Sequence, residues 1–223
     1  MATLTQGLTT PDSEHKYSLK TQLTEVSNEL LSSFPAPEKL SPVEQRGIIA
    51  RYSSVLEGNF IYWMTGAWIA AKTEEAQATI KDNLFEEVRD SHPAMLRKFF
   101  MAANASPNES DVLDVHANLT KVRLFIGKLS PTHIIAMMAF FEDFIQKFMP
   151  YLADLAKRRG SNEMEYTDVH GVCDVAHSEG LFHALEAELA VSAESDKNLF
   201  EGVDILKTLI QNIVFNHEFA KAQ

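Results

Sequence analysis

Apolar residues recur at intervals of three to four positions along most of this chain. One such series near the C-terminus comprises Val203, Leu206, Leu209, Ile210, Ile213 and Val214. This spacing places apolar side chains on one face of an α-helix, whereas the alternation typical of strands is nearly absent. The sequence therefore predicts an all-α protein, a bundle of seven or eight helices whose apolar faces meet in one core.

Two segments carry clear helix-start signals. Ser41-Pro42-Val43-Glu44 combines an N-cap, a first-turn proline and a capping-box glutamate, which predicts a helix from there to about Lys72. Ser130-Pro131 repeats the cap-then-proline start and predicts a helix that runs to Arg158 and ends at Gly160. Further helices are predicted near 22–33, 74–88, 93–103, 109–126, 168–190 and 196–219.

Composition excludes several classes of partner. The net charge of −11 repels nucleic-acid phosphates and anionic lipids, and the longest apolar stretch, Phe60–Ala71, is shorter than the roughly 20 residues of a membrane span. Residues 1–20 are polar and lack the pattern of a secretory signal. We expect them to form an N-terminal arm before a single helical domain, 21–223. The one cysteine, Cys173, suits a reducing compartment, so we expect a cytoplasmic protein.

The most informative group of polar residues is His170, Asp174 and His177. Their offsets of four and seven positions place all three within about 60° on one helix face. Imidazole and carboxylate together are the ligands of iron, manganese or zinc sites. From spacing alone, a chance grouping on a solvated face is an equally good interpretation. His183, six residues past His177, is expected to point away from this face.

Glu142 lies in the strongly apolar segment Met137–Met149. A carboxylate there is costly to bury unless it is paired or bound to a metal. Its helical neighbours are apolar, which favours an inward orientation over a surface one. Asp143 and Lys147, four residues apart, are expected to pair on the solvent side.

A third candidate segment runs from Glu86-Glu87 to His92-Pro93. Proline disfavours helix at the preceding residue and suits a first helical turn, so one helix is expected to end near Glu87 and the next to begin at His92. The two side chains can converge across such a break, although an acidic helix end followed by a capping histidine would also produce this pattern. Together the three segments offer enough ligands for two metal ions in a bundle core.

These segments, in this order, resemble the haem-oxygenase-like di-iron oxidases and oxygenases (TENA/PqqC-like fold), most closely the CADD-like proteins. Asn83–Glu87 and His92–Leu96 resemble the first ligand segment, Glu142 resembles a bridging glutamate, and His170-x3-Asp174-x2-His177 has the terminal ligand spacing. The resemblance covers roughly residues 40–215. It implies a haem-oxygenase-like bundle and the metal ligands Glu87, His92, Glu142, His170, Asp174 and His177. The gap before His92 is shorter than in many relatives, so Glu86 remains a rival to Glu87.

The resemblance implies a dioxygen-activating oxidoreductase. We expect two iron ions, or manganese in their place, dioxygen as co-substrate, a small organic substrate and a homodimer. CADD-like proteins make 4-aminobenzoate, consuming one of their own tyrosines with the help of a lysine. Candidate tyrosines here are Tyr52, Tyr62, Tyr151 and Tyr166. The alternatives are a helical interaction protein, or a cofactorless enzyme of the same fold such as PqqC or thiaminase.

Overall fold

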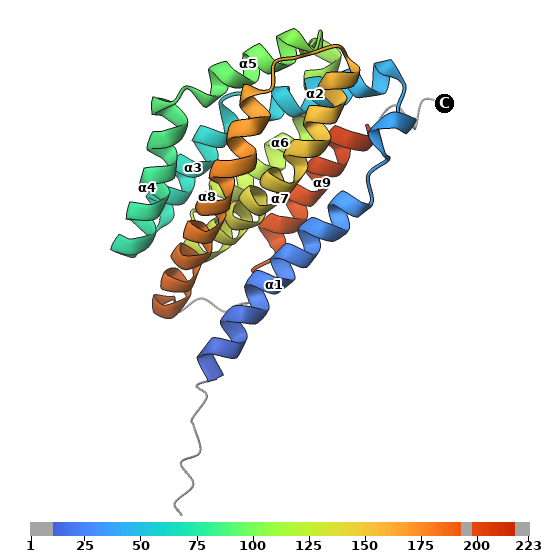
Figure 1. Ribbon diagram of the computed structural model, residues 1–223. Coiled ribbons are helices and arrows are strands. Elements are labelled where there is room, and N and C mark those ends of the chain that lie inside the picture. The colour runs from blue at the N-terminus through green and yellow to red at the C-terminus, as the bar shows by residue number, and fades with distance from the viewer. Residues whose placement is uncertain (1–10, 193–197, 217–223) are drawn as a thin grey trace, which may run out of the picture.

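The computed structural model describes residues 11–192 and 198–216, except the side chains of residues 11–18, Cys173 and Asp174 (Figure 1). Within these ranges the chain is an all-α bundle without strands, as predicted. Its helices are α1 (Pro11–Ser32), α2 (Pro42–Leu56), α3 (Asn59–Ala70), α4 (Glu74–Arg89), α5 (His92–Ala102), α6 (Glu109–Ile126), α7 (Pro131–Arg158), α8 (Glu165–Val191) and α9 (Glu201–Phe215), with the short 3-10 helix η1 (Pro37–Lys39). None of the helices described is long and apolar enough to cross a membrane.

Local signals place most helix ends correctly. The capping box at Ser41 is formed in both directions with Glu44, and α7 begins at Pro131 and ends at Arg158 as predicted. α1 begins at Pro11, earlier than the predicted start near residue 22. Residues 1–10, 193–197 and 217–223 lie outside the described residues. These ranges include part of the predicted N-terminal arm and both ends of the predicted helix 196–219.

The single helix predicted from residue 42 to about Lys72 is in fact two helices. Gly58, between α2 and α3, has φ of 82°, a left-handed conformation that costs an L-residue about 1–2 kcal/mol but costs glycine little. The apolar periodicity continues on both sides of the glycine, which is why the pattern concealed the break. The break leaves Leu56 at the end of α2 and Phe60 on the first turn of α3, and both line the cavity described below.

Helix α7 runs through the middle of the bundle beside α8 (Figure 1). Phe140, Phe144 and Phe148 stack along one of its faces at four-residue spacing, with centroids of the second pair 5.2 Å apart. One expectation for α7 is wrong: Asp143, predicted on the solvent side, is buried. Its carboxylate still pairs with the Lys147 ammonium at 2.8 Å, which compensates its burial.

Two glycines in helices provide a matched test of helix packing. A Cβ added at Gly202 of α9 would lie 2.5 Å from Cε1 of Phe125, whereas a Cβ at Gly171 of α8 would meet nothing within 4 Å. We expect Gly202→Ala to lower the free energy of unfolding by about 1–3 kcal/mol through overpacking. Gly171→Ala is expected to raise it by about 0.5–1 kcal/mol, because alanine loses less backbone entropy in a helix. Urea denaturation measures both; equal effects would show that Phe125 moves aside freely.

Candidate metal centre

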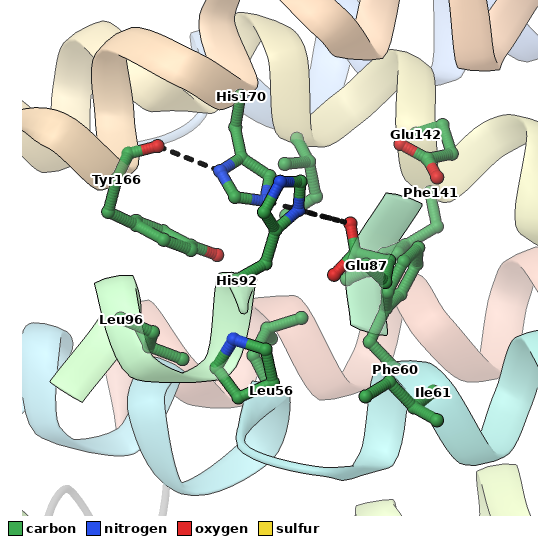
Figure 2. Close-up of a pocket in the computed structure, with 12 residues that line it drawn as sticks. Leu56, Phe60, Ile61, Glu87, His92, Leu96, Phe141, Glu142, Tyr166 and His170 are labelled. Atoms are coloured by element: carbon green, nitrogen blue, oxygen red, sulfur yellow. Dashed lines mark hydrogen bonds and ion pairs between the residues drawn. The ribbon is translucent and has the colours of Figure 1, made fainter. Parts of the chain in front are cut away.

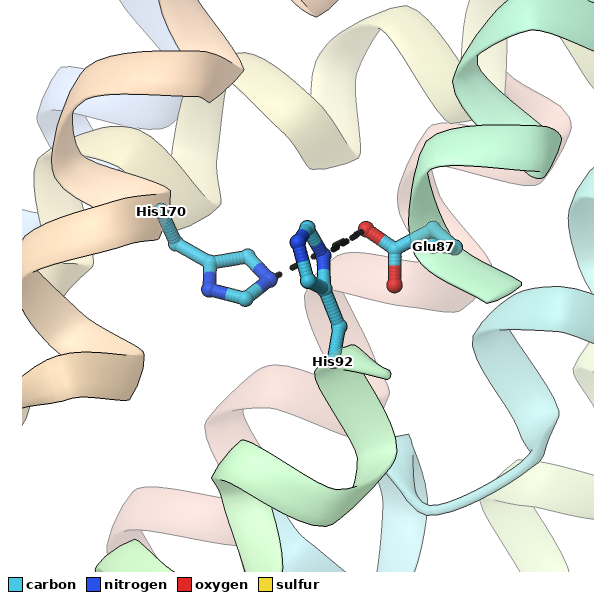
Figure 3. A group of neighbouring side chains, drawn as sticks. All are labelled: Glu87, His92 and His170. Carbon is cyan, nitrogen blue, oxygen red and sulfur yellow. Dashed lines mark hydrogen bonds and ion pairs between the residues drawn. The ribbon is translucent and has the colours of Figure 1, made fainter. Parts of the chain in front are cut away.

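Three ligand-type side chains from three helices meet in the core (Figure 3). Glu87 lies in the last turns of α4, His92 is the first residue of α5, and His170 lies on α8. All three are buried, and their ligand atoms lie within 4.8 Å of one another. Because metal–ligand bonds are about 2 Å long, ligand atoms of one ion lie at most about 4 Å apart. A small closing movement is therefore enough for these three groups to hold one ion.

The tight connection between α4 and α5 brings Glu87 and His92 together. Helix α4 ends at Arg89 and α5 begins at His92, as the His92-Pro93 pattern predicts. Ser91 between them adopts a left-handed φ of 58°, a conformation that costs a non-glycine residue about 1–2 kcal/mol and often marks a functional site. As a result, Nδ1 of His92 lies 2.7 Å from Oε1 of Glu87.

His170 is oriented by its own helix. Its Nδ1–H donates to the backbone carbonyl of Tyr166 at 2.8 Å, and its Nε2 faces Oε1 of Glu87 at 3.8 Å (Figure 2). A hydrogen bond from one imidazole nitrogen to a carbonyl is how proteins fix the other nitrogen toward a metal. The His92 and His170 rings lie with their centroids 4.5 Å apart. One nitrogen of each ring, Nδ1 of His92 and Nε2 of His170, thus lies near Oε1 of Glu87.

Burial lowers the pKa of His170 to about 4 from its ordinary value of 6.5, because the charged imidazolium loses its hydration in the core. The Glu87 carboxylate opposes this shift, and His92 adds to it. His170 is therefore neutral near pH 7, which is the form that binds a metal without first losing a proton.

This lowered pKa predicts acid sensitivity in protein stripped of metal. Below pH 6.5 the unfolded chain protonates His170, while the folded chain takes up that proton only near pH 4. The unfolded state then binds more protons, so stability falls as the pH falls, by up to roughly 3 kcal/mol across this window. Urea unfolding at several pH values should show this loss in the wild type and a smaller one in His170→Gln. If the free energy of unfolding changes with pH by the same amount in both proteins, the lowered pKa of His170 is contradicted.

A second carboxylate–imidazole pair lies beside the first cluster. Oε1 of Glu142, on α7, is 4.0 Å from Nδ1 of His177, on α8, and both side chains are buried. Figure 2 shows Glu142 on the far side of Glu87 from Tyr166. Nε2 of His177 lies 2.8 Å from Oε2 of Glu86, whose side chain is 43% exposed.

The predicted ligand face of α8 is partly described. His170 and His177 are both buried, and the side chain of Asp174 lies outside the described residues. His183 is on the surface, 3.8 Å from Glu186. The structure therefore gathers Glu87, His92 and His170 into one cluster and sets Glu142 and His177 next to it.

Glu142 also lines the same cavity as the first cluster (Figure 2). The volume of this cavity is about 30 Å³, and its other walls are Leu56, Phe60, Ile61, Pro93, Leu96, Phe141, Ile145 and Tyr166. The sequence contains no signal for most of these wall residues, because an apolar side chain that lines a cavity has the same pattern as one that fills a core. Such walls would exclude water from chemistry at the ligand cluster.

Two of the four candidate tyrosines lie at this site. The Tyr166 ring centroid is 4.2 Å from that of His170, and its hydroxyl is 2.7 Å from the Tyr52 hydroxyl. Tyr151 instead donates to the carbonyl of Pro35, and Tyr62 is 47% exposed.

The donor set suits iron. Imidazole nitrogens with carboxylate oxygens are the ligands of non-haem iron and also of manganese. Buried imidazoles and carboxylates are costly to keep together without a bound cation, and Glu87, His92, Glu142, His170 and His177 are all buried. The residues present therefore fit a metal centre.

Comparison with known proteins points the same way. A family model described as "iron-containing redox enzyme" matches residues 50–205, a segment that contains every candidate ligand. No curated protein and no solved structure matches the chain. Because the matched segment covers well over half of the chain, this protein belongs to the haem-oxygenase-like family of iron-containing redox enzymes.

Proposed function

We propose that the protein is a di-iron oxidase or oxygenase that uses dioxygen to oxidise a small organic molecule. Family membership supports the iron redox chemistry. The observation that carries the second ion is that another buried carboxylate, Glu142, adjoins His177 and faces the cavity of the first cluster. Two iron ions bound here would supply electrons to dioxygen, and manganese would be accepted by the same donors.

The proposed ligands divide into two groups. Glu87, His92 and His170 would hold one ion. Glu142 and His177 would hold the second, with Asp174 as a further ligand on the basis of its spacing along α8. In this arrangement the histidines hold fixed positions, because each lies on a helix packed into the core.

The position of His177 bears on the choice between Glu86 and Glu87. The two nitrogens of one imidazole point in different directions. In His177, Nδ1 faces Glu142 and Nε2 faces Glu86. Only one of these two glutamates can therefore bind the same ion as His177. Glu142 is buried and lines the cavity, whereas Glu86 is half-exposed. We assign Glu86 as an orienting partner that accepts the Nε2–H of His177.

This assignment predicts different outcomes for two neighbouring glutamates. Glu86→Gln is expected to lower the affinity for one of the two ions by about 10–100-fold, as loss of an orienting partner does. Both sites would still fill at high iron concentration. Glu87→Gln is expected to lose an ion outright. Anaerobic titration with ferrous iron measures the two affinities and the stoichiometry. If Glu86→Gln loses an ion and Glu87→Gln keeps both, the roles of the two residues are reversed.

The cavity walls support a substrate of limited polarity. Leu56, Phe60 and Phe141 form apolar walls of the cavity that contains the ligand cluster, and the Tyr166 hydroxyl is paired with the Tyr52 hydroxyl. A small, mainly apolar molecule would displace water from these walls and reach the cluster without leaving a buried charge unpaired.

A CADD-like reaction that consumes one of the protein's own tyrosines is a second candidate. It is favoured by Tyr166, whose ring lies beside His170, and by Tyr52, whose hydroxyl pairs with the Tyr166 hydroxyl. No lysine is among the described residues that line the cavity, so the assisting lysine of that reaction would have to come from elsewhere. Peptide mass spectrometry after aerobic reaction with iron tests it: loss of mass from a peptide containing Tyr52 or Tyr166 supports it, and unchanged peptides exclude it.

The first test of the main proposal is metal content and oxygen uptake. Protein produced with iron and purified without chelator is analysed by mass spectrometry for bound metals, and the ferrous-loaded protein is placed in an oxygen electrode. Two ions per chain with oxygen consumption support the proposal. No stoichiometric metal, even after anaerobic loading, favours the cofactorless enzyme; two ions without oxygen uptake favour the non-catalytic interaction protein.

A further inference from the structure

We infer that a second, smaller cavity behind the metal centre binds dioxygen. This cavity, about 10 Å³ in volume, lies where α2, α7 and α9 meet. It is lined by Tyr52, Leu56, Phe141, Phe144, Ile145, Phe148, Ile210 and Ile213. The identity of the gas rests on the proposed function, whereas the existence of an apolar gas site rests on the cavity alone.

The small cavity is separated from the ligand cluster by a single layer of side chains. Leu56, Phe141 and Ile145 line both this cavity and the larger one that contains the ligand-type residues. Glu142 directly follows Phe141 in the sequence and is itself buried. A molecule that leaves the small cavity past this shared wall therefore arrives directly at the candidate ligands.

The chemistry of the small cavity selects an apolar occupant. Its surface is entirely apolar, and the Tyr52 hydroxyl is directed to Tyr166. A buried water needs about two to four polar partners, so a cavity without them stays dry and binds apolar guests such as xenon. Dioxygen is apolar and uncharged and, with only two heavy atoms, is among the smallest guests of this kind, which suits a small cavity.

The two cavities also differ in access. Ile61 and Pro93, which line the larger cavity, are half-buried and mark its mouth, whereas every residue lining the smaller one is at most 8% exposed. The organic substrate would therefore enter from the mouth, and dioxygen would approach from the core on the other side of the shared wall. This separation would let both reactants be bound at the same time.

Xenon tests the cavity without metal or activity. Three of its residues, Ile145, Ile210 and Ile213, carry methyl groups that report on an occupant. In metal-free protein labelled at the isoleucine δ1 methyls, these three signals are expected to shift saturably with xenon pressure. The buried Ile80 and Ile126, which line neither cavity, serve as references.

Two substitutions change the cavity in opposite directions. Ile210→Phe fills it and is expected to abolish the xenon shift of Ile213, which lines the small cavity but not the larger one, while Ile213→Val enlarges the small cavity and is expected to increase xenon binding. The matched control is Ile205→Phe, a half-buried position on the same helix that lines neither cavity. If Ile210→Phe fails to fold, as circular dichroism would show, Ile213→Val still decides the result.

The role in dioxygen delivery is tested by stopped-flow oxidation of ferrous-loaded protein at several oxygen concentrations. Ile210→Phe is expected to slow the oxygen-dependent step several-fold at unchanged iron content, and Ile205→Phe is expected to leave it unchanged. Absence of saturable xenon shifts in both the wild type and the enlarged Ile213→Val cavity would overturn the gas site. Xenon shifts with an unaltered oxidation rate would overturn its role in oxygen delivery and leave the proposed function standing. Failure of the wild type to bind iron or consume oxygen would instead remove the proposed function, and xenon binding would still be judged separately.

Discussion

Replacing His170 by alanine is expected to remove one of the two iron ions proposed above and, with it, the proposed dioxygen-dependent activity. His170 is buried, its Nε2 faces Oε1 of Glu87, and its orientation is held by the Tyr166 carbonyl. Loss of an outer orienting partner already costs about 10–100-fold in metal affinity, so loss of a direct ligand is expected to cost more. Metal analysis after anaerobic loading and desalting measures the remaining ions.

The matched control is His183→Ala on the same helix. Its side chain is 69% exposed and lies 3.8 Å from Glu186, away from the candidate centre. This variant is expected to keep two ions and full oxygen uptake. Circular dichroism of both variants separates a lost ligand from a lost fold. If a folded His170→Ala protein retains two tightly bound ions, the first ligand group is wrong.

The largest effect on stability is expected from Glu188→Ala. Glu188 is completely buried on α8, and its Oε1 accepts hydrogen bonds from the backbone N–H groups of Lys72 and Thr73 at 2.7 Å each and from the Thr73 hydroxyl at 3.0 Å. Thr73 in turn caps α4. The carboxylate thus ties α8 to the start of the helix that carries Glu87. Alanine would leave these donors unpaired and a cavity beside them, which is expected to cost about 3 kcal/mol.

For a chain of this size, such a loss lowers the melting temperature by roughly 6–12 °C. Glu186→Ala, two positions earlier on the more exposed face, is the control and is expected to change stability by less than about 0.5 kcal/mol. Glu188→Gln should fall between the two, because an amide oxygen can still accept but carries no charge. Thermal unfolding of the metal-free proteins measures all three. Equal melting temperatures for Glu188→Ala and Glu186→Ala would show that the three hydrogen bonds contribute little.

The helices were largely predictable because their signals are local. The Ser41–Glu44 capping box and the Ser130-Pro131 start act within one turn of chain, and both form where predicted. The apolar pattern continues through Gly58 and predicts one helix there, and only the left-handed φ of Gly58 shows the break. The Asp143–Lys147 spacing predicts a pair on the solvent side, but the same ion pair compensates the burial of the Asp143 carboxylate, so the spacing alone does not decide exposure.

Several candidate ligands were also open to prediction from local pattern. A carboxylate within an apolar helix, as at Glu142, has to be paired or bound, and two histidines seven residues apart share a helix face. The walls of the cavity cannot be predicted in this way, because Leu56 and Ile145 follow the same periodicity as residues that simply fill the core. The support of His170 by the Tyr166 carbonyl was likewise invisible, since every helical residue has such a carbonyl.

The sequence by itself determined the all-α fold, most helix boundaries and the residue types of a metal centre, because these depend on contacts a few residues apart. Only the tertiary structure decided which of those residues meet. Glu87 and His170 are 83 positions apart, yet they lie 3.8 Å from each other because α4 and α8 pack together. Glu86 and Glu87 are neighbours in the chain, but the helical turn between them directs one to His177 and the other to His92. That choice depends on how the helices pack, a property that no short segment of the chain carries.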